Sequence, residues 1–255
     1  MIHFVGAGSG AADLITVRGA RLLKEADVII YAGSLVNPEL LSYAGKDCLI
    51  YDSAYMTLEE VIEVCRSAQE KGQNVVRLHT GDPSIYGAVR EQFDSLENLG
   101  IPYDVCPGVS SFCGAASSLK AEYTLPQVSQ SVIITRCEGK TQVPSGESIR
   151  SLAAHKATMI LFLSTSLASK IQTELTEGGY DPETPVAIVY KATWPEEKIF
   201  RCRLNNLADT VQEAGLTKTS LIIVGGCLGN EYDRSMLYHP AFSTEFRKSL
   251  KESNP

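Results

Sequence analysis

The sequence predicts an α/β protein of two α/β domains, each with a mostly parallel or mixed sheet and with helices on its faces. Short apolar runs alternate with segments of helical periodicity along most of the 255 residues. Polar, glycine-rich turns follow several of these runs, as turns do between a strand and the next helix. A mixed, polar stretch at 121–130 separates two series of this alternation. We therefore expect domains at 1–120 and 131–235, a linker at 121–130 and a tail at 236–255.

Each strand is predicted from an apolar, β-branched run bounded by turn residues, at 2–5, 28–31, 48–51, 75–78, 103–106, 132–135, 158–163, 185–190, 198–204 and 221–224. The run 198–204 is expected to pair antiparallel with the strand before it. Helices are predicted where apolar residues recur every three or four positions, beginning near residues 16, 58, 84, 110, 148, 167 and 207. Val17 is expected on the apolar side of the first helix, and Thr57 with Glu60 has the signature of a capping box.

The stretch 75–87 has the pattern of a ligand-binding turn. An apolar strand ends at Gly81-Asp82-Pro83, and a helical pattern follows from Ile85. In open α/β sheets, ligands bind at the carboxyl ends of strands, where Asp82 would carry a charge at the mouth of a cleft. The alternative is that Asp82 or Ser84 simply caps the helix, and this stretch taken alone favours that alternative.

Composition excludes several classes of protein. The net charge of −7 and the absence of a Lys/Arg cluster argue against nucleic acid as a partner. The seven cysteines are odd in number and scattered, as expected for reduced thiols in the cytoplasm rather than for disulfides or a zinc site. The four histidines lie far apart, so we expect no metal site, and His79 is expected to be a packing residue. We also expect no signal peptide and no membrane span.

The glycine turn Gly6-x-Gly8-x-Gly10 suggests a dinucleotide site, but its spacing is not GxGxxG. The ribose-binding acid expected after the second strand is missing, because Tyr31 is followed by Ala32-Gly33. A tight turn that keeps a ligand cleft open is therefore favoured over NAD binding. The strand-end loops are rich in Gly, Ser and Thr and poor in catalytic pairs, which suits a group transfer in which the enzyme mainly aligns two ligands.

Three motifs carry a family resemblance: Val5-Gly6-Ala7-Gly8, Thr80-Gly81-Asp82-Pro83 and Pro107-Gly108-Val109-Ser110. Their order and spacing resemble those of the tetrapyrrole methylases, which use S-adenosylmethionine, and the resemblance covers nearly the whole chain. The segments 31–36, 52–54, 135–141 and 190–195 are similar to those of members that methylate C11 of precorrin-4, or of its cobalt form, in cobalamin synthesis. The first loop departs from the family pattern, with Ser9-Gly10-Ala11-Ala12-Asp13 where Pro-Gly-Asp is usual.

The resemblance implies two α/β domains with a ligand trough between them, a homodimer, and S-adenosylmethionine as the methyl donor, released as S-adenosylhomocysteine. Carried over by position, the cofactor contacts would be Thr80, Gly81, Asp82, Ile85, Ser110, Ser111, Leu163, Ser164, Ala192 and Thr193. Asp82 would be the candidate catalytic residue, either offsetting the sulfonium charge or taking a ring proton.

The substrate implied by the resemblance is a tetrapyrrole that carries many carboxylates. An acidic protein needs local cations to bind such a polyanion, so the candidate substrate-binding residues are Arg136, Lys140 and Lys191, with Tyr86 against the macrocycle. Arg77, Arg203 and Trp194 are further candidates. Three alternatives stay open: a methyltransferase of this fold acting on another tetrapyrrole position, a nucleotide-dependent oxidoreductase, and a non-catalytic tetrapyrrole carrier.

Overall fold

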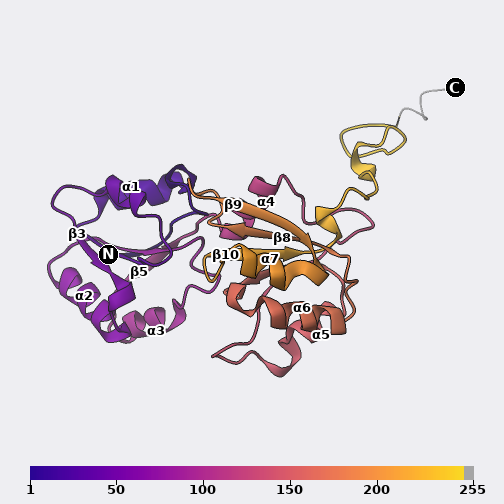
Figure 1. Ribbon diagram of the computed structural model, residues 1–255. Helices are drawn as coiled ribbons and strands as arrows, with labels where there is room; N and C mark the ends of the chain where they lie inside the picture. The colour runs from indigo at the N-terminus through magenta and orange to yellow at the C-terminus, as the bar shows by residue number, and fades with distance from the viewer. Residues whose placement is uncertain (250–255) are drawn as a thin grey trace. The chain divides into compact units, whose positions relative to one another are not determined.

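The computed structural model describes residues 1–249. It consists of two compact units, Met1–Leu119 with Tyr190–Lys198, and Lys120–Val189 with residues 199–249 (Figure 1). The segment Tyr190–Lys198 therefore packs with the N-terminal unit, although the predicted division along the sequence places it in the second domain. Each unit contains one five-stranded sheet. The predicted α/β class with two domains is confirmed.

The sheet of the first unit is parallel throughout, in the order β3-β2-β4-β1-β5. Its strands are β1 (Ile2–Gly6), β2 (Val28–Tyr31), β3 (Leu49–Asp52), β4 (Val75–His79) and β5 (Tyr103–Cys106). The helices of this unit are α1 (Val17–Glu25), α2 (Leu58–Glu70), α3 (Arg90–Asn98) and α4 (Ser111–Leu119). The chain leaves β1 toward β2 and leaves β4 toward β5, in opposite directions across the sheet, so a topological switch point lies between β1 and β4.

The two faces of this sheet have separate cores. Val5, Ile29 and Val76 pack with α1 on one face, whereas Phe4 and Ile30 pack with α2 and α3 on the other (Figure 1). This division follows from the alternation of side chains along a strand, and both faces are apolar because helices cover both.

The capping box of α2 is confirmed, and one residue placement in α1 is wrong. In the Thr57 capping box, the Thr57 hydroxyl accepts from the Glu60 N–H at 3.3 Å and the Glu60 carboxylate accepts from the Thr57 N–H at 2.7 Å. Thr16 caps α1 by accepting from the Gly19 N–H at 3.0 Å. The placement of Val17 on the apolar side of α1 is wrong, because its side chain is 91% exposed. Val17 is the first residue of the helix, and the buried residues of the helix are Gly19, Leu22 and Leu23.

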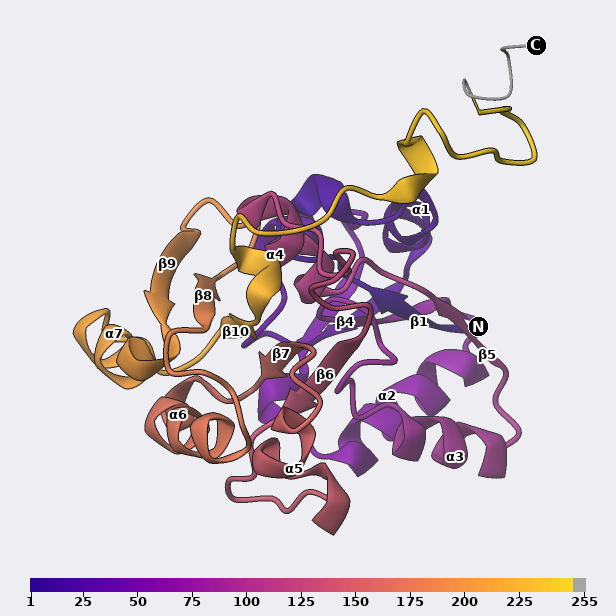
Figure 2. The same ribbon diagram turned by 90° about the vertical axis from the view of Figure 1, so that its right-hand side faces the viewer.

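The second unit has a mixed sheet in the order β6-β7-β10-β8-β9. Its strands are β6 (Val132–Arg136), β7 (Thr158–Phe162), β8 (Pro185–Tyr190), β9 (Lys198–Arg203) and β10 (Ser220–Val224). β6 pairs parallel with β7, and β7 pairs antiparallel with β10. The helices are α5 (Ile149–Ala153), α6 (Ala168–Glu177) and α7 (Leu207–Glu213), with α6 between the other two (Figure 2).

Short 3₁₀ helices complete the described chain, at Ala12–Leu14, Pro38–Tyr43, Ser53–Tyr55, Ser145–Glu147, Thr165–Leu167, Leu204–Asn206, Gly226–Leu228 and Met236–Tyr238. Within residues 1–249, none of the helices is long and apolar enough to cross a membrane.

Candidate functional site

Three glycine loops meet at the carboxyl ends of β1, β4 and β5 in the first unit. A Cβ atom on Gly6 would lie 2.6 Å from the Gly108 Cα and 2.6 Å from the Gly81 carbonyl oxygen. A Cβ atom on Gly108 would lie 2.2 Å from that same oxygen. Since a side chain at either position would overlap the neighbouring backbone, the glycines are what bring the loops together. The three loops, which contain Gly6, Gly81 and Gly108, pack together at the switch point of the sheet, and we call them the glycine floor.

The geometry of the first loop disfavours a dinucleotide site. Gly8 and Gly81 exchange hydrogen bonds, from the Gly8 N–H at 3.2 Å and from the Gly81 N–H at 3.0 Å, which fixes the turn to the next loop. The turn also does not lead into a helix, because α1 begins only at Val17 and Thr16 already caps it. A pyrophosphate needs a helix N-terminus directly after the glycine turn. The glycines here serve close packing instead.

Asp82 ties two of the loops together. Its Oδ2 accepts from the Gly108 N–H at 2.8 Å, and its Oδ1 accepts from the Ser84 N–H at 2.9 Å and from the Ser84 hydroxyl. The predicted helix start near residue 84 is wrong, because α3 begins at Arg90 and its N-cap residue, Val89, makes no side-chain cap. Asp82 therefore caps a turn rather than a helix.

These hydrogen bonds favour the ionised form of the Asp82 carboxyl. Partial burial by itself would raise the pKa of the Asp82 carboxyl. The hydrogen bonds from the Ser84 hydroxyl, the Gly108 N–H and the Ser84 N–H outweigh burial and lower the pKa below its usual value, because they stabilise the carboxylate. A carboxylate held in this way is a weak proton acceptor.

Left-handed backbone occurs on the loop after β4 and on the segment Tyr190–Lys198. Tyr86 and Ala88 have φ values of 54° and 48°, and Lys191 and Thr193 have φ values of 48° and 66°. Left-handed backbone at residues other than glycine costs about 1–3 kcal/mol each and is concentrated at functional sites. At Tyr86 and Ala88 it also explains the missing helix start, since the chain turns there instead of coiling.

The structure brings several predicted cofactor residues together at this floor. A Cβ atom on Gly81, whose φ is 60°, would lie 3.4 Å from the Ser110 Cα and 3.4 Å from the Ser111 nitrogen. Ser110 is buried, and Ser111 is the first residue of α4. The Thr80 hydroxyl donates to the Leu35 carbonyl at 3.4 Å, and Ile85 is half-buried on the adjoining turn.

Thr193 joins the first loop to the segment Tyr190–Lys198. Its hydroxyl oxygen accepts from the Ala11 N–H at 3.0 Å and lies 3.2 Å from the Ser9 hydroxyl. Ala192 beside it is buried. Sequence reasoning did not single out Ser9 as a site residue, because one serine in a polar loop carries no pattern.

Buried Asn37 was missed as well. Its side-chain amide donates to the Gly10 carbonyl at 3.0 Å and so braces the first glycine loop. The loop 32–37 was predicted as a strand-end loop, but nothing in the sequence distinguishes its asparagine as the residue that reaches Gly10.

The remaining predicted cofactor residues, Leu163 and Ser164, belong to the second unit. Leu163 is 63% exposed and left-handed, with a φ of 53°. Ser164 is fully buried; its hydroxyl accepts from the Cys137 N–H at 2.7 Å and donates to the Phe162 carbonyl at 2.6 Å. Ser164 therefore orders the end of β7 and leaves Leu163 exposed.

The cationic side chains that were predicted to bind the substrate have different surroundings. The Arg136 guanidinium donates to the Thr141 and Gln142 carbonyls and closes its own loop, in which Lys140 is exposed. The Lys191 ammonium lies 3.5 Å from the Glu196 carboxylate and 4.7 Å from the centre of the Trp194 ring. Tyr86 is 45% exposed on the loop after β4.

Two of the further cation candidates are engaged elsewhere. The suggestion that Arg77 binds substrate is wrong, because Arg77 is buried and donates to the Gln92 side-chain oxygen and the Ile30 carbonyl, each at 3.1 Å. Because side chains alternate between the two faces along β4, the Arg77 side chain points to the face that α2 and α3 cover. Arg203 donates to the Glu183 carbonyl at 2.9 Å.

His79 at the end of β4 is a packing residue, as expected. It is 4% exposed and stacks on Phe4 with ring centroids 5.9 Å apart. Burial, together with the nearby charge of Arg77, lowers the pKa of His79 to about 3. Its Nε2 has no hydrogen-bond partner among the described residues. The imidazole is neutral at physiological pH.

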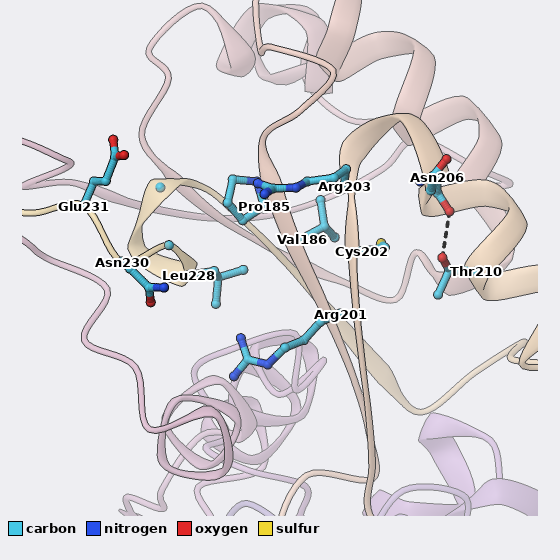
Figure 3. Close-up of a pocket in the computed structure, with 12 residues that line it drawn as sticks. Pro185, Val186, Arg201, Cys202, Arg203, Asn206, Thr210, Leu228, Asn230 and Glu231 are labelled. Carbon is cyan, nitrogen blue, oxygen red and sulfur yellow. Dashed lines mark hydrogen bonds between the residues drawn. The ribbon is translucent and has the colours of Figure 1, made fainter.

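A cavity of about 980 Å³ lies in the second unit, apart from these loops (Figure 3). Pro185 and Val186 at the amino end of β8 form part of its wall, together with Arg201 and Arg203 of β9. The predicted loop 190–195 follows the opposite end of β8. Figure 3 shows Asn206 and Thr210 at its far side, where the Thr210 hydroxyl donates to the Asn206 carbonyl at 2.8 Å. No predicted cofactor residue lines this cavity, so the candidate site is the set of glycine loops.

Comparison with known proteins agrees with the fold and the motifs. The model of the tetrapyrrole (corrin/porphyrin) methylases matches residues 1–208. A curated relative from Methanocaldococcus jannaschii, named cobalt-precorrin-4 C(11)-methyltransferase, is 54% identical over 252 residues, which are 98% of this chain and 97% of the relative.

Two solved structures have the same fold. The X-ray structure of a cobalt precorrin-4 methyltransferase, described as a cobalamin biosynthetic enzyme, matches with a TM-score of 0.88 and 42% identity, over 90% of this chain and 96% of that one. The uroporphyrin-III C-methyltransferase from Thermus thermophilus, complexed with S-adenyl homocysteine, matches with a TM-score of 0.75 and 26% identity, over 89% of this chain and 93% of that one.

Proposed function

We propose, from the premise that the chain belongs to the tetrapyrrole (corrin/porphyrin) methylases, that it is an S-adenosylmethionine-dependent methyltransferase acting on C11 of cobalt-precorrin-4 in cobalamin biosynthesis. The observation that carries this proposal is the 54% identity, over 98% of the chain, to a relative of that name. The glycine floor of the first unit supports it, because the three motifs of the resemblance are the three loops that meet there.

The first unit offers backbone groups, hydroxyls and one carboxylate, which suit a ligand with a zwitterionic amino-acid part and one additional positive charge. We propose that Thr80, Gly81, Asp82, Ile85, Ser110, Ser111, Ala192 and Thr193 hold S-adenosylmethionine, together with Leu163 and Ser164 of the second unit. Most of these residues present backbone groups or hydroxyls, and Ile85 adds apolar surface. Backbone groups fixed by neighbouring loops are preorganised, so little ordering is needed when the ligand binds.

The bound cofactor would supply an electrophilic methyl group on a sulfonium. The role of the protein is then to align the ring carbon with that methyl group and to exclude water. Because both oxygens of Asp82 already accept hydrogen bonds and its pKa is lowered, we assign Asp82 the offsetting of positive charge and the ordering of the loop. Taking a proton from the ring is the less favoured role for this residue.

Cations near the site would bind the carboxylates of the substrate. The protein has a net charge of −7, so a polyanionic tetrapyrrole needs local positive charge. We propose Lys191, Arg136 and Lys140 for this role, and Tyr86 for contact with the macrocycle. Lys191 is held beside Thr193 by its contacts with Glu196 and Trp194, and this places a cation on the same segment as two proposed cofactor contacts.

From the family resemblance we also propose that the protein is a homodimer, and we propose that it acts in the cytoplasm. All seven cysteines are free thiols, which is consistent with a reducing compartment. Sedimentation equilibrium of the purified protein would measure the subunit number directly.

Calorimetric titration with S-adenosylhomocysteine tests the cofactor, with NAD and FMN as controls. We expect saturable binding of S-adenosylhomocysteine alone. Preference for NAD or FMN would instead support the oxidoreductase alternative, and binding of a tetrapyrrole without any S-adenosylhomocysteine site would support the carrier.

Incubation with S-adenosylmethionine and each tetrapyrrole then tests the acceptor. We expect a single methylation at C11 of cobalt-precorrin-4, with metal-free precorrin-4 compared in parallel and uroporphyrinogen III as the control acceptor. Methylation of uroporphyrinogen III instead would assign the chain to another position of the macrocycle.

A further inference from the structure

The segment Tyr190–Lys198 is fitted closely onto the first glycine loop and α4 within the first unit. A Cβ atom on Gly10 would lie 2.2 Å from the Trp194 Cδ1 and 2.3 Å from the Ala192 carbonyl oxygen. A Cβ atom on Gly114 of α4 would lie 2.5 Å from the Ser9 Cβ of the first loop and 3.2 Å from the Thr193 Cγ2 of the segment. Both glycines therefore make room for the docked segment.

Glu197 is at the centre of this docking. One oxygen of its carboxylate accepts from the Thr193 N–H at 2.6 Å and from the Ser118 hydroxyl at 2.5 Å. Ser118 lies near the end of α4, the helix that begins with Ser111. The carboxylate thus links the segment to a helix that carries a proposed cofactor contact.

Thr193 needs such support. It is a β-branched residue with a left-handed φ of 66°, a conformation that is unfavourable for this type of side chain. Three contacts hold it: its N–H donates to Glu197, and its hydroxyl oxygen accepts from the Ala11 N–H at 3.0 Å and lies 3.2 Å from the Ser9 hydroxyl. If Glu197 were removed, the contact of the Thr193 N–H would be lost and the strained conformation would be less well held.

We propose that Glu197 is a positioning residue, a latch that holds the segment Tyr190–Lys198 against the first glycine loop and thereby sets the affinity for the cofactor. This inference rests on the proposed function, because Ala192 and Thr193 are among the proposed cofactor contacts. It also gives the unusual Ser9-Gly10-Ala11 sequence a role: a hydroxyl at 9, space for Trp194 at 10 and an N–H for Thr193 at 11.

The latch depends on a hydrogen-bond acceptor rather than on charge. A glutamine at position 197 would still present a carbonyl oxygen to the Thr193 N–H and the Ser118 hydroxyl, whereas an alanine would present nothing. Glu197→Gln is therefore the conservative variant that rescues the latch. A role in binding positive charge would instead require the carboxylate.

The chain carries its own reporter for the docked segment. Trp194 is the only tryptophan in the sequence, and it packs against Gly10 inside the segment that Glu197 holds. Its fluorescence and its quenching by acrylamide measure the docking directly, without cofactor or substrate.

The test compares Glu197→Ala, Glu197→Gln and Ser118→Ala with the unaltered protein. Glu25→Ala is the matched control, because Glu25 is an exposed carboxylate at the end of α1 in the same unit. We expect Glu197→Ala to raise the acrylamide quenching constant about twofold and to weaken S-adenosylhomocysteine binding about tenfold, since it removes two hydrogen bonds to a carboxylate. Glu197→Gln and Glu25→Ala should stay within about twofold of the unaltered protein in both measurements.

The outcomes separate the latch from the proposed function. Unchanged quenching in Glu197→Ala would overturn the latch, and increased quenching with unchanged S-adenosylhomocysteine affinity would overturn its link to the cofactor. If the unaltered protein binds no S-adenosylhomocysteine, the proposed function fails and the link fails with it, while quenching still decides whether Glu197 docks the segment. Should Glu197→Ala not fold, Ser118→Ala removes one of the two hydrogen bonds and is judged by the same two measurements.

Discussion

The two units bury different kinds of polar side chain. The buried polar residues of the first unit include Arg77, His79 and Gln92, whereas those of the second unit are all serine or threonine among the described residues. Hydroxyls are easily satisfied by a nearby carbonyl, but an ionisable group in a core lowers stability unless it is well bonded. The first unit therefore contains features that folding alone would not favour.

These buried groups lie beneath the strained loops. Arg77 bonds Gln92, and the Gln92 amide donates in turn to the carbonyl of left-handed Ala88 at 2.9 Å. A chain of hydrogen bonds thus runs from the core of the first unit to the loop after β4. The comparison teaches that only the first unit buries basic side chains beneath its loops among the described residues, whereas left-handed backbone occurs in both units, for example at Leu163 in the second.

The largest effect is expected when a crowded glycine of the first unit and an uncrowded glycine of the second unit are each replaced by alanine. Gly108→Ala should destabilise the protein by about 4 kcal/mol, beyond the usual range for overpacking, because its Cβ would meet backbone on two sides. Gly146→Ala in the second unit should change stability by less than about 0.5 kcal/mol, since nothing lies within 4 Å of its Cβ position. Urea denaturation measures both, and equal effects would show that the glycine floor is not tightly packed.

A smaller effect is expected from pH. Since the pKa of His79 is lowered to about 3 in the folded protein, the unfolded chain binds a proton there that the folded one does not. The stability this residue contributes is complete above about pH 6.5 and falls as pH drops toward 3, by about 2 kcal/mol between pH 7.5 and 5.

The free energy of unfolding of His79→Leu is measured at these two pH values. The difference between them should be smaller than in the unaltered protein by the contribution of His79, whatever the absolute stability of the variant. His155→Asn, which alters an exposed histidine of the second unit, is the control and should keep the full difference. If both variants keep it, the acid sensitivity does not come from the core of the first unit.

The smallest effect on stability is expected at Asp82. Asp82→Asn keeps the shape of the side chain but loses part of its hydrogen bonding to Ser84 and Gly108, so a loss of about 1 kcal/mol is expected. The lowered pKa means that this contribution is present at neutral pH and is lost only as pH falls through the pKa of the folded state.

Turnover of the same variant separates the two roles of Asp82. A residue that orders a loop and offsets charge should leave at least about one tenth of kcat, whereas a general base should lose about 10²–10⁴-fold. A loss in the larger range would return Asp82 to the role of proton acceptor.

The sequence by itself determined the α/β class, the strands and the motif loops. Apolar, β-branched runs such as Val75–Leu78 and local signals such as the Thr57–Glu60 pair act over a few residues, and so they can be read without knowing the partners. The family could be recognised for a related reason, since its three motifs are short, contiguous loops.

Only the tertiary structure decided how those loops are used. Ile85 and Val89 have helical spacing, yet the chain between them turns through left-handed Tyr86 and Ala88, because Asp82 holds the loop to Gly108 from another strand. Arg77 is of a residue type that usually lies at the surface, yet its position on β4 directs its side chain into the core. The contacts of Glu197 with Ser118, and of Thr193 with Ala11, join residues far apart in the chain. Such contacts depend on where strands and segments are placed in space, and no local pattern of residue types records that placement.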